Sequence, residues 1–295
     1  MSVLCFGSLN IDYTYEVPHF VAAGETLASA SLQQFAGGKG LNQSVALARA
    51  GAEVYHAGAI GVEGAFLLEM LRSSGVDVQH VETMPQVRTG HAIIQREPGG
   101  DNCILLYGGA NRCISSERMA EVLSHFGQGD VLMLQNEIND LGQLMNLARQ
   151  RGMRIALNPS PMEKGVLALP LELVDLFFLN EVEARQVTDA PDGIDSEALL
   201  QALRQKFPHA AVVLTLGGAG AVYQDEKETV FQPAFPVEVV DTTAAGDTFS
   251  GYFLGSMLRG ETVTKAMETA SRAAAMACTR HGAAPSIPYL AEVQQ

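Results

Sequence analysis

Short apolar segments alternate with helical patterns along most of the chain, and this alternation limits the possible folds more than any other feature. The apolar runs have the length of buried strands and lie at 3–9, 53–60, 131–134, 154–157, 176–179 and 211–216. The helical segments carry apolar residues on one face and lie at 40–51, 63–74, 115–126, 140–151, 195–206, 245–259 and 263–280, with another beginning at 181. Strands joined by such helices form βαβ units, so we predict a three-layer α/β/α fold with a mostly parallel central sheet.

Two regions do not follow this alternation, namely 13–35 and 89–107. The second contains TGHAIIQR and NCILLY on either side of Glu97-Pro98-Gly99-Gly100-Asp101, which is the pattern of an antiparallel hairpin. We assign both regions to a small antiparallel β lid, formed by about 11–35 and 88–109. No low-complexity linker divides the chain, so we expect one domain over 1–295 that carries this lid.

The charge of the chain excludes several kinds of partner. There are 33 acidic and 19 basic residues, which gives a net charge of −14. Nucleic-acid binding and docking on an anionic membrane both need a basic face, so we expect neither. The longest uncharged run, 207–224, is interrupted by proline and glycines and predicts two strands around a turn rather than a membrane helix. The first basic residue is Lys39, which argues against a secretory signal, and the four cysteines form no C-x-x-C pair. We therefore expect a cytoplasmic protein.

The sequence DTTAAGDTFSG at 241–251 is the most informative for chemistry. Ala244, Ala245 and Gly246 are small, so the backbone there can approach a ligand closely. They open a predicted helix, whose free N–H groups and partial positive charge suit a transferring phosphoryl group. Asp247 follows directly and could accept a proton from an attacking hydroxyl. The alternative is that Asp247 only caps the helix.

Two further glycine-rich segments adjoin predicted elements. FAGGKGLN at 35–42 opens a helix but lacks the Walker A spacing. TLGGAG at 215–220 follows a buried strand and lacks the dinucleotide-binding spacing, which disfavours a nicotinamide-dependent dehydrogenase. Each segment alone could be an ordinary glycine turn. The seven histidines show no metal-ligand spacing, and we expect them to be structural or solvated.

In this order, the segments resemble the ribokinase-like carbohydrate kinases, which are ATP-dependent sugar and nucleoside kinases. The resemblance runs from 7 to 288 and rests on GSLNID, GGKGLNQ, NPSP, NEVE, TLGGAG, DTTAAGDTFSG and TRHGAAPSIP. The form DTTAAGDTF is closer to the ribokinase branch than the DTTGAGD of fructokinases. The resemblance implies an α/β kinase domain with a lid, and it assigns expected roles to individual residues.

By resemblance, Asp247 is the catalytic base, and Ala244, Ala245 and Gly246 form the anion hole. The implied sugar-binding residues, besides Asp247, are Asn10, Asp12, Gly38, Lys39, Asn42 and Glu137. The implied nucleotide-binding residues are Asn180, Thr215, Leu216, Gly217, Gly218, Gly220, Gly246 and Ser271. Asn180 and Glu183 would organise Mg²⁺ largely through water. A monovalent cation, K⁺, would lie in loops containing Asp241, Thr243, Ala277, Arg280, Gly282 and Ser286.

The expected reaction is transfer of the γ-phosphate of ATP to the primary hydroxyl of a sugar. The first expectation for that sugar is D-ribose, which would give ribose 5-phosphate. The same chemistry on a nucleoside, fructose or a sugar acid remains open. A non-catalytic sugar sensor on the same fold is the other class of alternative, which the presence of Asp247 and the glycine turn disfavours. We also expect a homodimer, because the lid has an apolar face, including Ile93, Ile104 and Leu106, that must be covered.

Overall fold

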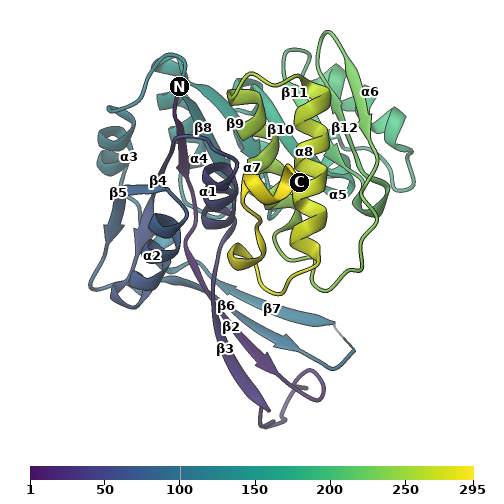
Figure 1. The fold of residues 1–295 in the computed structure, drawn as a ribbon. Helices are drawn as coiled ribbons and strands as arrows, with labels where there is room; N and C mark the ends of the chain where they lie inside the picture. The colour runs from purple at the N-terminus through teal and green to yellow at the C-terminus, as the bar shows by residue number, and fades with distance from the viewer. Residues whose placement is uncertain (100) are drawn as a thin grey trace.

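The computed structural model describes residues 1–99 and 101–295. Gly100, in the predicted turn at 97–101, lies outside the described residues. A nine-stranded sheet forms the centre, in the order β13-β12-β11-β10-β9-β8-β1-β4-β5 (Figure 1). The parallel strands are β1 Val3–Phe6, β4 Val54–Ile60, β5 Asp77–Thr83, β8 Val131–Gln135, β9 Arg154–Asn158, β10 Leu176–Asn180 and β11 Ala211–Thr215. The antiparallel strands β12 Ala221–Gln224 and β13 Thr229–Gln232 extend one edge.

Helices cover both faces of this sheet, as the alternation predicts. They are α1 Lys39–Arg49, α2 Ala65–Ser73, α3 Ser116–Leu123, α4 Leu141–Gln150, α5 Glu181–Thr188, α6 Ser196–Lys206, α7 Ala245–Leu258, α8 Val263–Cys278 and α9 Leu290–Val293. The short 3₁₀ turns are η1 Val62–Gly64, η2 Gly109–Arg112, η3 Lys164–Ala168, η4 Leu171–Leu173, η5 Gly217–Ala219 and η6 Ala284–Ser286.

Alternate residues of the strands face two separate cores. In β1, Val3 and Cys5 pack in one core with α1, α7 and α8, whereas Leu4 and Phe6 pack in the other with α3, α4 and α6. This period of two, with helices on each side, is what a buried parallel sheet requires. It confirms the predicted three-layer α/β/α fold.

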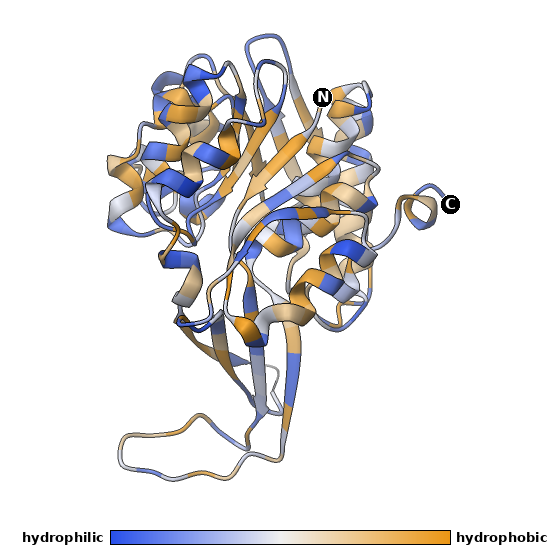
Figure 2. Cartoon of the chain, turned by 90° about the vertical axis from the view of Figure 1, so that its left-hand side faces the viewer, coloured by the Kyte–Doolittle hydropathy of each residue, from blue (hydrophilic) through white to orange (hydrophobic). Residues whose placement is uncertain are grey.

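The lid is a separate four-stranded sheet in the order β3-β2-β6-β7 that projects from the body (Figure 2). Its strands are β2 Asn10–Glu16, β3 Ser31–Gly37, β6 Gly90–Arg96 and β7 Asn102–Tyr107. The β2–β3 and β6–β7 pairs are antiparallel, but β2 and β6 join them in parallel, which the sequence did not reveal. The long connection between β3 and β6 permits this pairing, since the intervening chain runs through the body first.

One expected grouping on the lid is wrong. Ile93 is paired with Leu105 across the β6–β7 ladder, so it shares a face with Leu105 and not with Ile104 and Leu106. Neighbouring residues along a strand point to opposite faces, which splits the predicted apolar set. All six residues of β7 are exposed, and that strand is apolar on both faces.

The sequence did not predict two strands of the central sheet. β5 has the mixed sequence DVQHVET and lies at one edge, where only His80 is buried. β13 is four residues long and lies at the opposite edge. Neither forms a continuous apolar run, because an edge strand does not need one. None of the helices in residues 1–99 and 101–295 combines the length and apolar character needed to cross a membrane.

Candidate active site

The amino-terminal ends of α1 and α7 meet because glycines let the two helices pack closely. A Cβ atom on Gly251 would lie 2.4 Å from the Cβ of Ala46, and one on Gly255 would lie 2.8 Å from the Cβ of Ala50. Both distances are shorter than any real contact, so only glycine fits at these positions. Asp247 is one turn before Gly251, and Asn42 is one turn before Ala46. The close packing therefore brings the side chains of Asp247 and Asn42 together.

Asp247 is 5% exposed and is bound through both carboxylate oxygens to α1. The side-chain amide of Asn42 donates to Oδ2 at 3.0 Å, and that of Gln43 donates to Oδ1 at 2.8 Å. Among the described residues, no side chain caps α7, whose N-cap is Ala244 with φ 62°. The alternative of a simple capping acid is therefore not what the geometry shows, because the Asp247 carboxylate is engaged with another helix.

A cavity of about 220 Å³ opens beside Asp247 at the carboxyl ends of the strands. Its lining combines Lys39, the first turn of α7 and polar residues that follow β9, β10 and β11. The full lining consists of Lys39, Asn158, Ser160, Phe178, Leu179, Asn180, Glu183, Thr215, Thr242, Ala244, Ala245, Gly246, Asp247 and Ser250. Gly246 is exposed, and in the described part of the chain no heavy atom beyond its neighbours and the backbone of α7 comes within 4 Å of where its Cβ would be. Backbone N–H groups at a helix start beside a lysine can hold an anionic group here.

Lys39 is surrounded by acids. Asp247 is the main cause that raises the pKa of Lys39, with Glu137 and Glu183 adding to it against the opposing effect of burial. Its backbone N–H donates to Glu137 Oε2 at 2.9 Å, and Ser8 Oγ donates to the same oxygen. Burial raises the pKa of Glu137, although the charge of Lys39 and these hydrogen bonds oppose the shift. The local positive charge therefore comes from one lysine and a helix terminus, not from a basic cluster.

Asp12 is a half-buried carboxylate at the base of the lid. Burial, together with the charge of Glu137, raises its pKa to about 7. A Cβ on Gly37 would lie 2.0 Å from Asp12 Oδ2, so a larger residue there would displace the Asp12 carboxylate. Gly38 has φ 95° and precedes α1, where an L-residue would be strained. These two glycines bring the lid carboxylate against the start of α1.

Asn10 is held by a residue that the sequence analysis missed. Asn111 Nδ2 donates to Asn10 Oδ1 at 2.7 Å, and Asn111 Oδ1 accepts from the N–H of Leu9 at 3.0 Å. Asn111 is 1% exposed and lies in η2, directly after the lid. Ser8 and Gln43 were missed as well. Ser8 and Gln43 lie inside GSLNID and GGKGLNQ, so their position in those motifs was the available signal, whereas Asn111 lies in no motif.

The glycine-rich segment 215–220 joins strand β11 to strand β12 through the 3₁₀ turn η5, the strand-turn-strand arrangement that the sequence predicts. Gly217 and Gly220 have φ values of 56° and 122°, which favour glycine. Apart from the adjoining residues of the chain, no heavy atom among the described residues lies within 4 Å of a Cβ built on Gly217 or Gly218, so their backbone is open to a ligand. Thr215 lines the cavity, but Leu216, Gly217, Gly218, Gly220 and Ser271 do not. Ser271 is buried in α8, and its hydroxyl donates to the carbonyl of Pro233 at 3.3 Å.

Asn180 and Glu183 form a capping box at the start of α5. Asn180 Oδ1 accepts from the N–H of Glu183 at 2.9 Å, and Glu183 Oε2 accepts from the N–H of Asn180 at 3.0 Å. Both residues line the cavity. Within 1–99 and 101–295, no group of three or more His, Cys, Asp or Glu side chains is arranged to hold a metal ion.

Asp241 connects two loops behind the first turn of α7. Its Oδ1 accepts from the N–H and the hydroxyl of Thr243, at 2.9 and 2.6 Å, and its Oδ2 accepts from the N–H of Gly282 at 3.1 Å. Burial alone would raise the pKa of Asp241, but these hydrogen bonds outweigh it and the pKa is lowered. The loop containing Ser286 is thus tied to a carboxylate that stays charged. Ala277 lies in the last turn of α8, and Arg280 lies just beyond its end.

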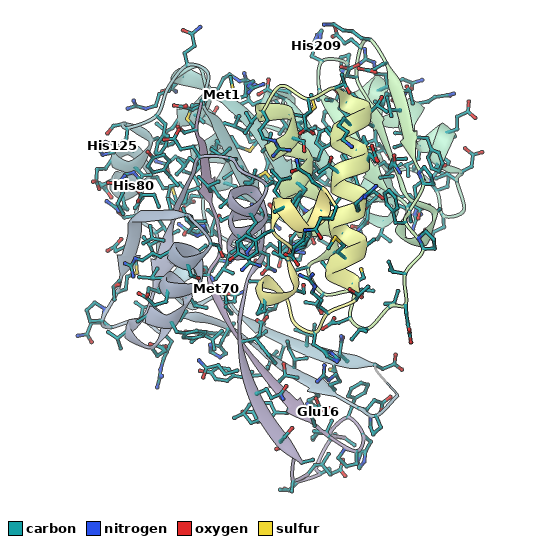
Figure 3. The ribbon with its side chains drawn as sticks, viewed as in Figure 1. Met1, Glu16, Met70, His80, His125 and His209 are labelled. Atoms are coloured by element: carbon teal, nitrogen blue, oxygen red, sulfur yellow. The ribbon has the colours of Figure 1, made fainter. Side chains whose placement is uncertain are left out.

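The histidines labelled in Figure 3 lie in the body, away from the lid, where Glu16 is labelled, and His80 is buried. His80 and His125 pack together with ring centroids 5.2 Å apart, against Phe126. Burial, followed by the charges of His125 and Arg118, lowers the pKa of His80. His209 is exposed and pairs with Glu226. These contacts are structural or solvent-facing, as the sequence predicts.

The comparisons agree with this architecture. The sequence pattern of the pfkB family of carbohydrate kinases matches residues 1–290. The ribokinase of Haemophilus influenzae is 33% identical over 289 residues, which covers 96% of this chain and 94% of that protein. A ribokinase structure from Cryptococcus neoformans in complex with ADP has a TM-score of 0.87 at 30% identity and covers 100% of this chain and 99% of its own. Arabidopsis thaliana ribokinase complexed with ribose and ATP has a TM-score of 0.87 at 28% identity, with coverages of 99% and 97%.

Proposed function

The chain belongs to the pfkB family of carbohydrate kinases, and on that premise we propose that it transfers the γ-phosphoryl group of ATP to the primary hydroxyl of D-ribose. The product is ribose 5-phosphate. The observation that carries the proposal is the position of Asp247, whose carboxylate lies in the first turn of α7 at the wall of the cavity. Full-length similarity to ribokinases, one of them complexed with ribose and ATP, supports ribose over the other acceptors.

In the proposed mechanism, Asp247 accepts the proton of the primary hydroxyl as its oxygen attacks the γ-phosphorus of ATP. The bond from that phosphorus to the β,γ-bridging oxygen breaks, and ADP leaves. Backbone N–H groups of Ala244, Ala245 and Gly246 and the ammonium group of Lys39 stabilise the charge on the transferring group. Phosphoryl transfer needs mainly such positioning and charge stabilisation, so no nucleophilic side chain is required.

The sugar is bound on the lid side of Asp247 in this proposal. Asp12 and Glu137 accept hydrogen bonds from ribose hydroxyls, while Asn10 and Asn42 supply amide groups. Asn42 Oδ1 is buried and has no hydrogen-bond partner within the described residues, which leaves it free to accept from a hydroxyl. A Cβ on Gly38 would lie 3.0 Å from the backbone nitrogen of Asn10, so glycine lets the start of α1 lie close to this sugar-binding residue.

Two cations belong to the same proposal. Asn180 and Glu183 would hold Mg²⁺ through water, and Mg²⁺ bound with ATP neutralises phosphate charge. The loops of Asp241, Thr243, Ala277, Arg280, Gly282 and Ser286 would hold K⁺, mostly through carbonyl oxygens. The charged Asp241 carboxylate, which is tied to both loops, supports that assignment.

An acceptor panel tests the substrate. In a coupled assay of ADP release, we expect D-ribose to give the highest kcat/KM among pentoses, 2-deoxyribose, hexoses and nucleosides. A nucleoside, fructose or a sugar acid preferred over ribose by tenfold, about 1.4 kcal/mol, would overturn the ribose assignment. If ADP is formed with none of these acceptors, the alternative of a non-catalytic sugar sensor replaces the kinase proposal. The same assay with and without K⁺ tests the monovalent cation, and a rate unchanged by K⁺ contradicts it.

A homodimer formed through the lid is also proposed. β7 is an edge strand whose side chains Ile104, Leu105, Leu106 and Tyr107 are each more than half exposed. Such an apolar edge is normally covered by a partner. We expect a dimer at micromolar concentration in sedimentation experiments, and we expect Leu105→Lys to weaken it by roughly tenfold or more because it buries a charge in place of an apolar group. A wild-type monomer at that concentration contradicts the proposal.

A cytoplasmic location completes the proposal. All four cysteines are free thiols, and Cys103 and Cys113 are exposed. Exposed thiols persist in a reducing compartment, which is also where ATP is available. Fractionation of cells that produce the protein tests the location, and recovery from an oxidising compartment would contradict it.

A further inference from the structure

Asp247 is the endpoint of a chain of buried amides that begins on the central sheet. Gln43 Nε2 donates to Asp247 Oδ1 at 2.8 Å, and Gln43 Oε1 accepts from Gln135 Nε2 at 2.6 Å. Gln43 is on α1, Gln135 is the last residue of β8, and both side chains are 0% exposed. The three residues come from three separate elements that meet at the carboxyl edge of the sheet (Figure 1).

The orientation of the two glutamine amides follows from which groups can donate and which can accept hydrogen bonds. An ionised carboxylate can only accept hydrogen bonds, so Gln43 must present its NH₂ group to Asp247. Its oxygen then faces Gln135, which must present its own NH₂ group in turn. Gln135 Oε1 is left without a partner in the described part of the chain, and it lies 2.3 Å from where a Cβ on Gly7 would be. The missing side chain at Gly7 thus leaves room for Gln135 to hold this orientation.

We propose that Gln43, itself oriented by Gln135, is a positioning residue that fixes the Asp247 carboxylate for proton transfer; this rests on the proposed role of Asp247 as the base. Gln43 occupies Oδ1 from the buried side. Asn42, which is expected to contact the sugar, occupies Oδ2. When a sugar hydroxyl replaces or shares the bond at Oδ2, Gln43 still prevents the carboxylate from rotating. The proton is therefore accepted at Oδ2, the oxygen on the substrate side.

Gln43→Met tests the role, since methionine has a similar length but donates no hydrogen bond. We expect kcat to fall roughly 10- to 100-fold, because a misplaced catalytic group costs up to about 100-fold. The KM values for ribose and ATP should stay within about threefold, because Gln43 is proposed to touch neither substrate. Ser44→Ala is the matched control. It removes another fully buried hydrogen bond of α1, between Ser44 Oγ and His56 Nδ1, and it should leave kcat within twofold even if it lowers Tm.

A double-mutant cycle tests the relay from Gln135. If Gln135 acts through Gln43, Gln135→Met lowers kcat less than Gln43→Met does, and the double variant is no slower than Gln43→Met. Multiplied losses in the double variant would remove Gln135 from the proposal. The positioning role is overturned if Gln43→Met keeps kcat within twofold, if its loss lies in KM alone, or if Ser44→Ala loses as much kcat. An active Asp247→Asn variant would instead refute the proposed base, and this role with it.

Discussion

Asp247→Asn is expected to lower kcat by about 10²- to 10⁴-fold, the usual contribution of a general base. Asparagine has nearly the same shape as aspartate but cannot accept the hydroxyl proton. The KM of the variant for ATP should change little, because the anion hole of Ala244, Ala245 and Gly246 consists of backbone N–H groups. The substitution leaves these groups in place. Steady-state kinetics with ribose and ATP, together with Tm as a check on folding, measure the effect.

Asp195→Asn is the matched control for this variant. Asp195 caps α6, where its Oδ1 accepts from the N–H of Ala198 at 2.8 Å. Asparagine caps a helix about as well as aspartate does, so this change should leave both activity and stability nearly unaltered. If Asp247 were only a capping acid, the two variants would behave alike. Wild-type activity in Asp247→Asn therefore contradicts the catalytic assignment.

The sequence predicts the central sheet well because burial on both faces demands continuous apolar runs. β8, β9, β10 and β11 are such runs, and each was found within a residue or two. β5 was missed because it is an edge strand with alternating polar residues. The parallel pairing of β2 with β6 could not be predicted, since the paired residues, such as Asn10 and Gly90, are 80 positions apart in the sequence and nothing local specifies their partner.

The candidate site is predicted where backbone geometry dictates residue type. Gly38 and the 244–247 turn are recognisable because a positive φ, a helix start and a close approach leave few choices of residue. Asn111 and Gln135 could not be predicted, because their amides act through tertiary contacts with Asn10 and Gln43 that no spacing encodes. Ile93 was predicted to share a face of the lid with Ile104 and Leu106. That prediction was wrong because the face of a residue depends on the strand register, which the sequence alone does not give.

Asp12 couples sugar binding to the stability of the protein. Its carboxylate is half-buried and near Glu137, and its pKa is raised to about 7 from an ordinary value of 3.8. The folded protein therefore holds a proton that the unfolded chain has released between these two pH values. The free energy of unfolding falls as the pH rises through this window, and the full penalty is present above pH 7.

Asp12→Asn should separate the two effects. Hydrogen bonds from sugar hydroxyls to a charged group contribute about 1.5–3 kcal/mol each, so losing the charge should lower kcat/KM for ribose by roughly 10- to 10²-fold for each such bond. Without sugar, the variant should have a higher Tm than the wild type at pH 8 and nearly the same Tm at pH 4, because asparagine does not titrate. Asp192→Asn, at an exposed carboxylate, should show no such pH-dependent difference. A lower Tm for Asp12→Asn at pH 8 would mean that the Asp12 carboxylate stabilises the free protein, contrary to the cost inferred from its raised pKa.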